Sequence, residues 1–209
     1  MSRVELVVAH FKEDLGWLND LVESCPLNSM FLATVYEKGG SSEIDADKSS
    51  QSLVQHKVLK NVGRETHTYL SHIIENYYKL ADVTAFVQGK PSDHSMTIKT
   101  DLEDLVTGRY EVNSFKYLSD WRIEIKNFVP QYHPRIQRML GDLYDDLFRT
   151  VRPQRFCFNA GAMFCVTRQT IQQRPKWFYE YLIGFVDKAI NPIHGFCFER
   201  LWELIFDKE

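Results

Sequence analysis

RETHTYLSHIIENYYKLADVTAFVQ (residues 64–88) joins a helical pattern to a strand pattern, and this order decides the fold. Its first part carries apolar and aromatic side chains at the spacing of one helix face. These positions are Tyr69, Leu70, Ile73, Ile74 and Tyr77. Its last part, VTAFVQ (83–88), is a short apolar run with β-branched residues, which is typical of a strand covered on both faces.

The same alternation runs through the chain that precedes this stretch. VELVVAHF (4–11), MFLATVY (30–36) and HKVLKN (56–61) have the pattern of strands, and EDLGWLNDLVES (13–24) has that of a helix. Strands that alternate with helices in this way predict an α/β fold with an open, mostly parallel sheet.

The second half of the chain is less regular, but it also predicts helices and strands. Helical patterns occur in TDLEDLVTG (100–108), PRIQRMLGDLYDDLFRTV (134–151), TIQQRPKWFYEYLIGFVDKAI (170–190) and HGFCFERLWELIF (194–206). RYEVNSFKYL (109–118) is typical of an edge strand, and RFCFNAGAMFCVTR (155–168) of two strand pieces divided by small residues.

Length, charge and cysteine usage limit the class of protein. The 209 residues are enough to bury most of the apolar surface within one domain, which we assign to residues 1–209. The net charge of −3 argues against nucleic acid as a partner, because binding to the phosphate backbone needs clustered Lys and Arg. The four cysteines form no CxxC pair, so neither a zinc ribbon nor a redox motif is indicated. No apolar run approaches the ~20 residues of a membrane span and the N-terminus lacks a signal-peptide pattern, so we expect a cytoplasmic protein.

Polar side chains follow each of the four strands predicted in the first half. His10 follows the first strand, Glu37 the second, NVGR (61–64) the third and QGKPSDH (88–94) the fourth. In an open parallel sheet, ligands bind beyond the carboxyl ends of the strands. The pattern therefore predicts a polar ligand at this edge, although ordinary surface loops also follow strands.

NVGRE (61–65) leads into the helix quoted first. Gly63 precedes a first turn that contains Arg64 and Glu65. A helix N-terminus and an arginine both favour an anion, so the segment predicts an anion site. The alternative is a plain helix start with Arg64 in a surface ion pair. The segment is not a P-loop, because GxxxxGK[ST] is absent.

The end of the fourth predicted strand carries more polar groups than a turn needs. Asp93 and His94 are candidate ligands for Mn²⁺ or Mg²⁺, since both ions accept carboxylate oxygen and Mn²⁺ also accepts imidazole. In the alternative, Asp93 or Ser92 caps a helix and His94 is solvated. The one literal Asp-x-Asp, at Asp45 and Asp47, lies in a polar loop into which no strand runs directly, and we interpret it as solvated.

Two segments of the second half are candidates to face a ligand. FNAGAMF (158–164) places small residues between two strand pieces, where either a ligand approaches the backbone or the chain simply turns. Glu199 lies among apolar residues, where a desolvated carboxylate needs a partner such as Arg200 or a substrate hydroxyl. Alternatively, Glu199 and Arg200 occupy the solvated face of the last helix.

Five stretches occur in order over nearly the whole chain: VVAHFKEDLGWL, NVGRETHTYLSHIIENY, TAFVQGKPSDH, NAGAMFCVTR and HGFCFERLWELIF. Together they resemble GT-A-type nucleotide-sugar glycosyltransferases, and more closely a branch that includes domains of chlorella virus enzymes acting on the glycan of the major capsid protein. The resemblance implies a Rossmann-like mixed, mostly parallel central sheet of about six strands flanked by helices. It also implies a UDP-sugar donor, a glycan or glycoprotein acceptor, and Mn²⁺ or Mg²⁺.

The resemblance divides the domain into a nucleotide-binding half, residues 1–95, and an acceptor and sugar half, residues 96–209. It also implies that further domains of a longer polypeptide can accompany this one, and that a viral member would act in the host cytoplasm.

The resemblance implies a metal site with an unusual ligand set. In such enzymes the fourth strand ends at a DxD motif that binds the metal between the two phosphates. Here the matching strand ends in Gln88 and Gly89, which we assign to donor binding. The metal would then fall to Asp93 and His94, together with His194 near the C-terminus.

The remaining roles also follow from the matching stretches. His10, Asn61 and Arg64 match positions beside the donor nucleotide, and Asn159 and Gly161 match the small-residue loop that faces the donor sugar. Glu199 matches an acidic residue near the acceptor, and we assign it the catalytic role. It would act as base in an inverting reaction or orient the acceptor in a retaining one, and the resemblance favours retention.

Two other functions stay open. A non-catalytic UDP-sugar-binding module would bind the donor without turnover, and the missing DxD supports it. A metal-dependent phosphohydrolase that used Asp93, His94 and His194 would release phosphate or nucleotide without an acceptor. Against the hydrolase, the sequence shows no dense carboxylate–histidine cluster of the kind that two-metal hydrolases need.

Overall fold

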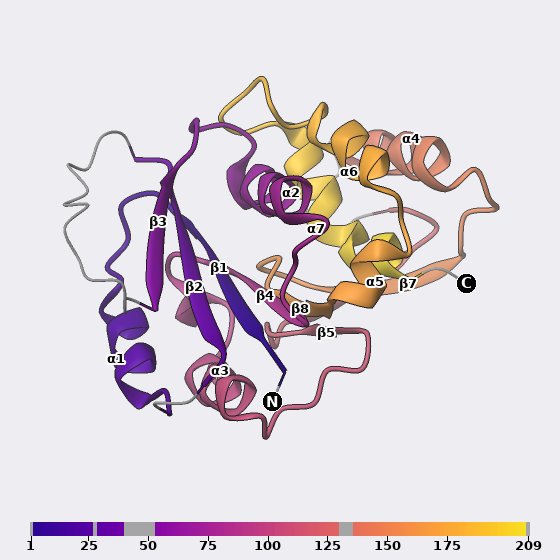
Figure 1. The fold of residues 1–209 in the computed structure, drawn as a ribbon. Helices are drawn as coiled ribbons and strands as arrows, with labels where there is room; N and C mark the ends of the chain where they lie inside the picture. Colours follow the sequence, from indigo (N-terminus) through magenta and orange to yellow (C-terminus); the bar gives the residue numbers. More distant parts are fainter. Residues whose placement is uncertain (1, 27–28, 40–52, 130–135, 208–209) are drawn as a thin grey trace.

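The computed structural model describes residues 2–26, 29–39, 53–129 and 136–207. Figure 1 shows a central sheet with helices on both faces. The strands of this sheet are β1 (Val4–His10), β2 (Phe31–Glu37), β3 (Val54–Val58), β4 (Val83–Gln88), β5 (Phe115–Tyr117) and β8 (Phe164–Thr167). The helices are α1 (Gly16–Ser24), α2 (Arg64–Asn76), α3 (Ile98–Thr107), α4 (Gln137–Phe148), α5 (Arg168–Gln172), α6 (Lys176–Ile183) and α7 (Ile193–Phe206).

The six strands lie in the order β3-β2-β1-β4-β8-β5. The first four strands of the chain run parallel, and β8 runs antiparallel to both of its neighbours. The predicted α/β fold with a mixed, mostly parallel sheet is therefore confirmed. The strand order reverses at β1, with β2 and β3 on one side and β4 on the other, so the topological switch point lies between β1 and β4.

Each face of the sheet has its own apolar core, which explains the continuous apolar pattern of the central strands. Leu6 and Val8 of β1 pack with the buried face of α1 and α3. Val7, between them, belongs to the opposite core, with α2, α6 and α7 and the fully buried Trp202. Figure 1 shows the same division, with α1 and α3 on one side of the sheet and α2 and α7 on the other.

Three elements differ from the sequence prediction. The third strand is Val54–Val58 and not 56–61. The helix predicted over 170–190 is divided into α5 and α6, because Pro175 stands at the N-cap of α6 and has no N–H to continue α5. The segment Arg122–Lys126 forms β6, which pairs with β7 (Arg155–Asn159) in a separate two-stranded sheet.

No helix in the described part of the chain combines the length and the apolar character that crossing a membrane requires.

Candidate functional site

A pocket of about 240 Å³ opens at the carboxyl ends of β1 and β4. We call it the switch-point pocket, because it lies where the strand order reverses. Its polar lining residues are His10, Glu13, Lys38, Asn61, Arg64, Glu65 and Gln88. Four of the seven, namely His10, Asn61, Arg64 and Gln88, are donor-binding residues predicted from sequence.

His10 ends β1 and is held as a cation. Its Nδ1 donates to the Glu37 carboxylate at the end of β2, and its Nε2 lies 2.9 Å from the carbonyl oxygen of Glu13. Both partners are acceptors, so both ring nitrogens carry a proton. Burial lowers the pKa of His10, but the hydrogen bonds to Glu37 and Glu13 outweigh burial, and the pKa is raised. Glu37 also accepts from His56, at 2.9 Å.

Lys38 follows β2 and is only 6% exposed. Its ammonium donates to the carbonyl oxygens of Val62, at 2.5 Å, and Arg64, which ties the end of β2 to the start of α2. Burial lowers the pKa of Lys38 to about 8, although the charge of Glu65 opposes this shift. An ammonium has three N–H donors, and the described residues use two of them.

The start of α2 presents a guanidinium and few free backbone donors. Gly63 adopts a φ of +67°, which favours glycine. The N–H groups of Gly63 and Arg64 donate to the carbonyl oxygens of Ala189, at 2.7 Å, and Ile190, at 3.3 Å. The Arg64 guanidinium lies 4.4 Å from the centroid of the Phe196 ring, which holds its planar fork in place. The anion site predicted from NVGRE stays a prediction, and it would depend on the Arg64 side chain more than on the helix N-terminus.

Gly161 connects the end of β4 to α7. Its carbonyl oxygen accepts from the Gln88 side-chain amide at 2.6 Å, and its N–H donates to Glu199 Oε1 at 2.7 Å. The other oxygen of Glu199 lies 3.1 Å from the Arg200 guanidinium. Gly161 has a φ of +101°, and a Cβ at this position would lie 2.6 Å from His94. Glycine is thus required here both by backbone conformation and by close packing.

Three predicted donor residues, Gly89, Asn159 and Gly161, are not among the described residues that line this pocket. Asn159, at the end of β7, donates to the carbonyl oxygen of Ser119. The carbonyl oxygen of Gly89 accepts from the Trp17 indole at 2.9 Å. Gly89 nevertheless lies beside the pocket, because a Cβ there would be 2.5 Å from a carboxylate oxygen of the lining residue Glu13.

The chain matches the family model DUF3431, described as a protein of unknown function, over residues 6–209. The chain belongs to the DUF3431 family. A search of curated proteins finds no match to it. The family description names no activity, so the function of this DUF3431 chain has to be argued from its site.

The three predicted metal ligands of the DUF3431 chain do not meet in one cluster. Asp93 is exposed and forms an ion pair with Lys90 at 2.8 Å, and His94 packs against Gly161. Across the described residues, no group of three or more His, Cys, Asp or Glu side chains is placed to hold a metal ion. Asp45 and Asp47 lie outside the described residues. The described donor set therefore does not fit the ion that the resemblance implies, and these ligands stay a prediction.

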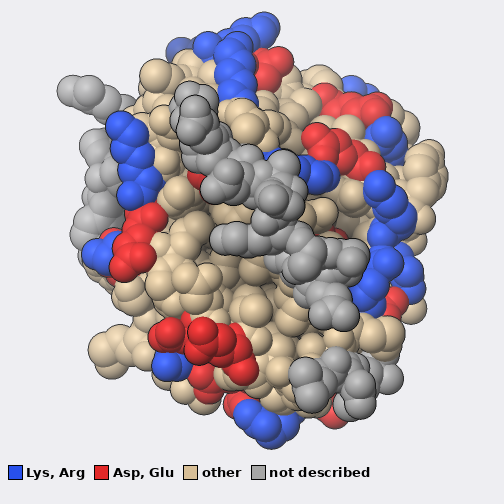
Figure 2. Space-filling view, turned by 60° about the vertical axis from the view of Figure 1, so that its left-hand side comes forward, with Lys and Arg blue, Asp and Glu red and all other residues tan. Residues whose placement is uncertain are grey.

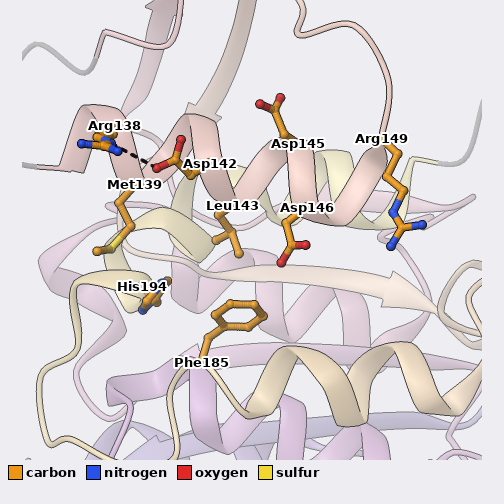
Figure 3. A pocket seen from close by; sticks show the side chains of 9 residues that line it. All are labelled: Arg138, Met139, Asp142, Leu143, Asp145, Asp146, Arg149, Phe185 and His194. Atoms are coloured by element: carbon orange, nitrogen blue, oxygen red, sulfur yellow. Dashed lines mark ion pairs between the residues drawn. The ribbon is translucent and has the colours of Figure 1, made fainter.

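His194 lies in a different and larger pocket, of about 890 Å³, between α4 and the start of α7. Figure 3 shows Asp146 pointing toward Phe185, while Asp145 points away from it. The rings of His194 and Phe185 are 5.2 Å apart, and burial lowers the pKa of His194. Asp146 accepts from the Tyr181 hydroxyl. The surroundings of His194 favour a neutral imidazole.

Sequence reasoning did not assign Glu13, Lys38 or Glu65 to the site. Lys38 directly follows a strand, and Glu65 lies in the first turn of α2, so position alone offered a signal for both. Glu13 reaches the pocket through the turn after β1, for which the sequence holds no comparable signal. Glu65 is buried, and burial raises its pKa, although Arg64 opposes the shift.

Charged side chains of both signs lie beside one another on the face shown in Figure 2. The expectation that nucleic acid is not a partner stays a prediction.

Proposed function

We propose that the chain is a glycosyltransferase that moves a sugar from a UDP-sugar donor to a glycan or glycoprotein acceptor. The observation that carries this proposal is the switch-point pocket, where His10, Lys38 and Arg64 place cationic groups at the carboxyl ends of the parallel strands. Nucleotides bind at this place in open α/β sheets. The sugar-transfer chemistry comes from the GT-A resemblance, and the mixed six-stranded sheet is compatible with it.

The charges of the pocket suit the leaving group of this reaction. Breaking the bond between a sugar and a diphosphate leaves negative charge on the phosphate oxygens. Fixed cations beside those oxygens stabilise that charge as it develops, without reorganising during the reaction. Lys38 and Arg64 supply such cations, and both are held by contacts of their own, to backbone carbonyls and to Phe196.

The sugar would lie against the connection between β7 and β8, residues 160–163, which we call the Gly161 loop. This loop is small and is fixed from both sides, by Gln88 and by Glu199. His94 covers one side of Gly161, and on the other side the small residues Ala160 and Gly161 would let a ring approach the backbone closely. The loop is therefore a suitable platform for the donor sugar.

The role of Glu199 as base stays a prediction, because both of its oxygens already have partners. To accept a proton, Glu199 would have to release the N–H of Gly161 or the guanidinium of Arg200. Glu65 is a second candidate carboxyl, since it lines the pocket and burial raises its pKa. Groups with a perturbed pKa in a cleft are over-represented among catalytic acids and bases.

The experiment that tests the proposal is calorimetric titration of UDP, GDP and CMP, followed by transfer assays with a panel of UDP-sugars and glycan acceptors. Selective binding of UDP together with transfer to an acceptor supports the proposal. UDP binding without turnover would instead indicate a binding module, and acceptor-independent release of phosphate or nucleotide from many diphosphates would indicate a hydrolase. Absence of nucleotide binding would refute the proposed site.

A further inference from the structure

We infer that the switch-point pocket holds the diphosphate of its ligand without a divalent metal ion, through the side chains of Lys38 and Arg64. The inference rests on the proposed function for its ligand class, a nucleoside diphosphate. It departs from the metal-bridged arrangement that the GT-A resemblance implies, and it does so on the chemistry of the residues around the pocket.

The carboxylates nearest the pocket are already engaged. Glu13 Oε2 accepts from the N–H groups of Phe11, at 2.8 Å, and Lys12, at 3.1 Å. Glu37 is held by the imidazoles of His10 and His56. Burial favours the neutral form of Glu65. A hard cation such as Mn²⁺ needs several free anionic oxygens, and this part of the described structure offers no such set.

The end of β4 is also unsuited to a metal. Gln88, which replaces the first carboxylate of the expected motif, is neutral and uses its amide to hold Gly161. At Gly89, a Cβ would lie 2.5 Å from a carboxylate oxygen of Glu13. Any side chain at position 89 would therefore meet Glu13, and position 90, where the second carboxylate of the motif would stand, is the cation Lys90, which pairs with Asp93.

Lys38 and Arg64, in contrast, have N–H donors that the described residues do not fully use. Lys38 directs two N–H groups to backbone carbonyls, which fixes the ammonium and leaves its third donor without a partner among the described residues. Arg64 makes only long polar contacts in the described structure, 3.4 Å to Glu65 and 3.4 Å to Asn191, and keeps its fork oriented by stacking on Phe196. An ammonium and a guanidinium in one pocket match the two phosphates of a diphosphate.

The test is calorimetric titration of UDP into the protein in EDTA and in Mn²⁺, with inorganic pyrophosphate titrated in EDTA as a probe of the diphosphate subsite alone. We expect the same UDP affinity in both buffers and measurable pyrophosphate binding. Arg64→Gln and Lys38→Met should each weaken binding about ten- to hundredfold, the loss of a charge-assisted hydrogen bond. Arg64→Gln is less disruptive to the fold, because Lys38 also donates to two backbone carbonyls. Urea unfolding checks that both variants fold.

Arg109→Gln is the matched control. Arg109 lies two residues after α3 and pairs with Asp104 at 2.7 Å, and its chain neighbours Gly108 and Tyr110 line a pocket with Val4 and Val83, at the amino ends of β1 and β4. This variant should bind UDP as the unaltered protein does. UDP binding that requires Mn²⁺ would overturn the inference and leave the proposed function intact, whereas no UDP binding in either buffer would refute the proposed function itself. Pyrophosphate binding unchanged in Arg64→Gln and Lys38→Met would overturn the assignment of these two cations.

Discussion

Replacing Glu199 with alanine should destabilise the fold strongly, because this carboxylate has two partners and one of them is a buried charge. Glu199 accepts the N–H of Gly161 at 2.7 Å and faces Arg200, which is only 4% exposed. Removing one member of a buried pair costs about 3–5 kcal/mol, and leaving a buried N–H without an acceptor costs about 1–3 kcal/mol. One carboxylate carries both interactions, so the costs overlap. We expect a loss of about 3–5 kcal/mol in the free energy of unfolding.

Urea unfolding measures this loss, and two further variants show which contact carries it. Glu199→Gln keeps an oxygen for the Gly161 N–H but leaves Arg200 without a counter-charge. The double variant Glu199→Gln, Arg200→Met removes both charges, and it should be more stable than Glu199→Gln alone. Glu180→Gln, in an exposed ion pair of α6 with Lys176, should change the free energy of unfolding by less than about 1 kcal/mol.

Two results would refute this reasoning. If the free energy of unfolding of Glu199→Ala differs by less than about 1 kcal/mol from that of the unaltered protein, Glu199 does not hold the Gly161 loop in solution. If the double variant is no more stable than Glu199→Gln, the buried charge of Arg200 is not the source of the loss. The first result would leave Glu199 with the catalytic role that the resemblance implies, which transfer assays on a well-folded Glu199→Gln would test. The second would assign the loss to the hydrogen bond with the Gly161 N–H.

Three other predictions follow from packing, backbone conformation and titration. Gly63→Ala should lower the free energy of unfolding, measured with urea, more than Gly108→Ala does. Both glycines have positive φ, but a Cβ at Gly63 would lie 2.4 Å from a backbone oxygen, whereas at Gly108 nothing lies within 4 Å. Gly108→Ala therefore gives the cost of the backbone conformation alone, about 1–2 kcal/mol. Trp202→Ala should lower the free energy of unfolding by about 3–5 kcal/mol. Trp177→Ala removes a side chain that is 64% exposed and should change it by less than about 0.5 kcal/mol. Equal losses in the two variants would contradict the placement of Trp202 in the core. Burial lowers the pKa of His72 to about 3, so below pH 6.5 the unfolded state binds the extra proton. The contribution of His72 should then lower stability by about 1.4 kcal/mol per pH unit toward pH 3. His72→Gln should flatten that slope in urea titrations between pH 7 and 5, and an unchanged slope would show that other groups carry it.

The elements that the sequence predicted well are those whose burial is complete and local. VTAFVQ matches β4 residue for residue, because a strand covered on both faces is apolar without interruption. β6 has the burial pattern of an exposed ribbon, with Ile125 its one buried residue, and it gave no such signal. The division of the helix over 170–190 was readable from Pro175, whose missing N–H ends α5, but the apolar periodicity on both sides concealed it.

The site was less predictable, since its contacts join segments that are distant in the sequence. The hydrogen bond between Gln88 and Gly161 spans 73 residues, and nothing near either residue indicates the other. The contact of His10 with Glu37 is different. These two residues are register partners at the ends of adjacent parallel strands, so the pairing of β1 with β2 dictates their contact. A contact between two strand-end residues can therefore be predicted once the order of the strands in the sheet is known.

The position of the site residues follows from this register and not from a motif. A parallel sheet brings His10, Glu37 and Gln88 to one edge whatever their identity, since each stands at the end of its strand. Their chemistry then decides what binds there. With carboxylates at the end of β4, the same edge would attract a divalent cation, which in turn would bind phosphate. With an amide at Gln88, a doubly protonated His10 and a buried Lys38, the edge is already suited to an anion. The amide of Gln88, in place of the carboxylate that the resemblance implies, and the cations beside it would thus serve the same purpose, anion binding without a metal ion. The titrations of UDP in EDTA test both together.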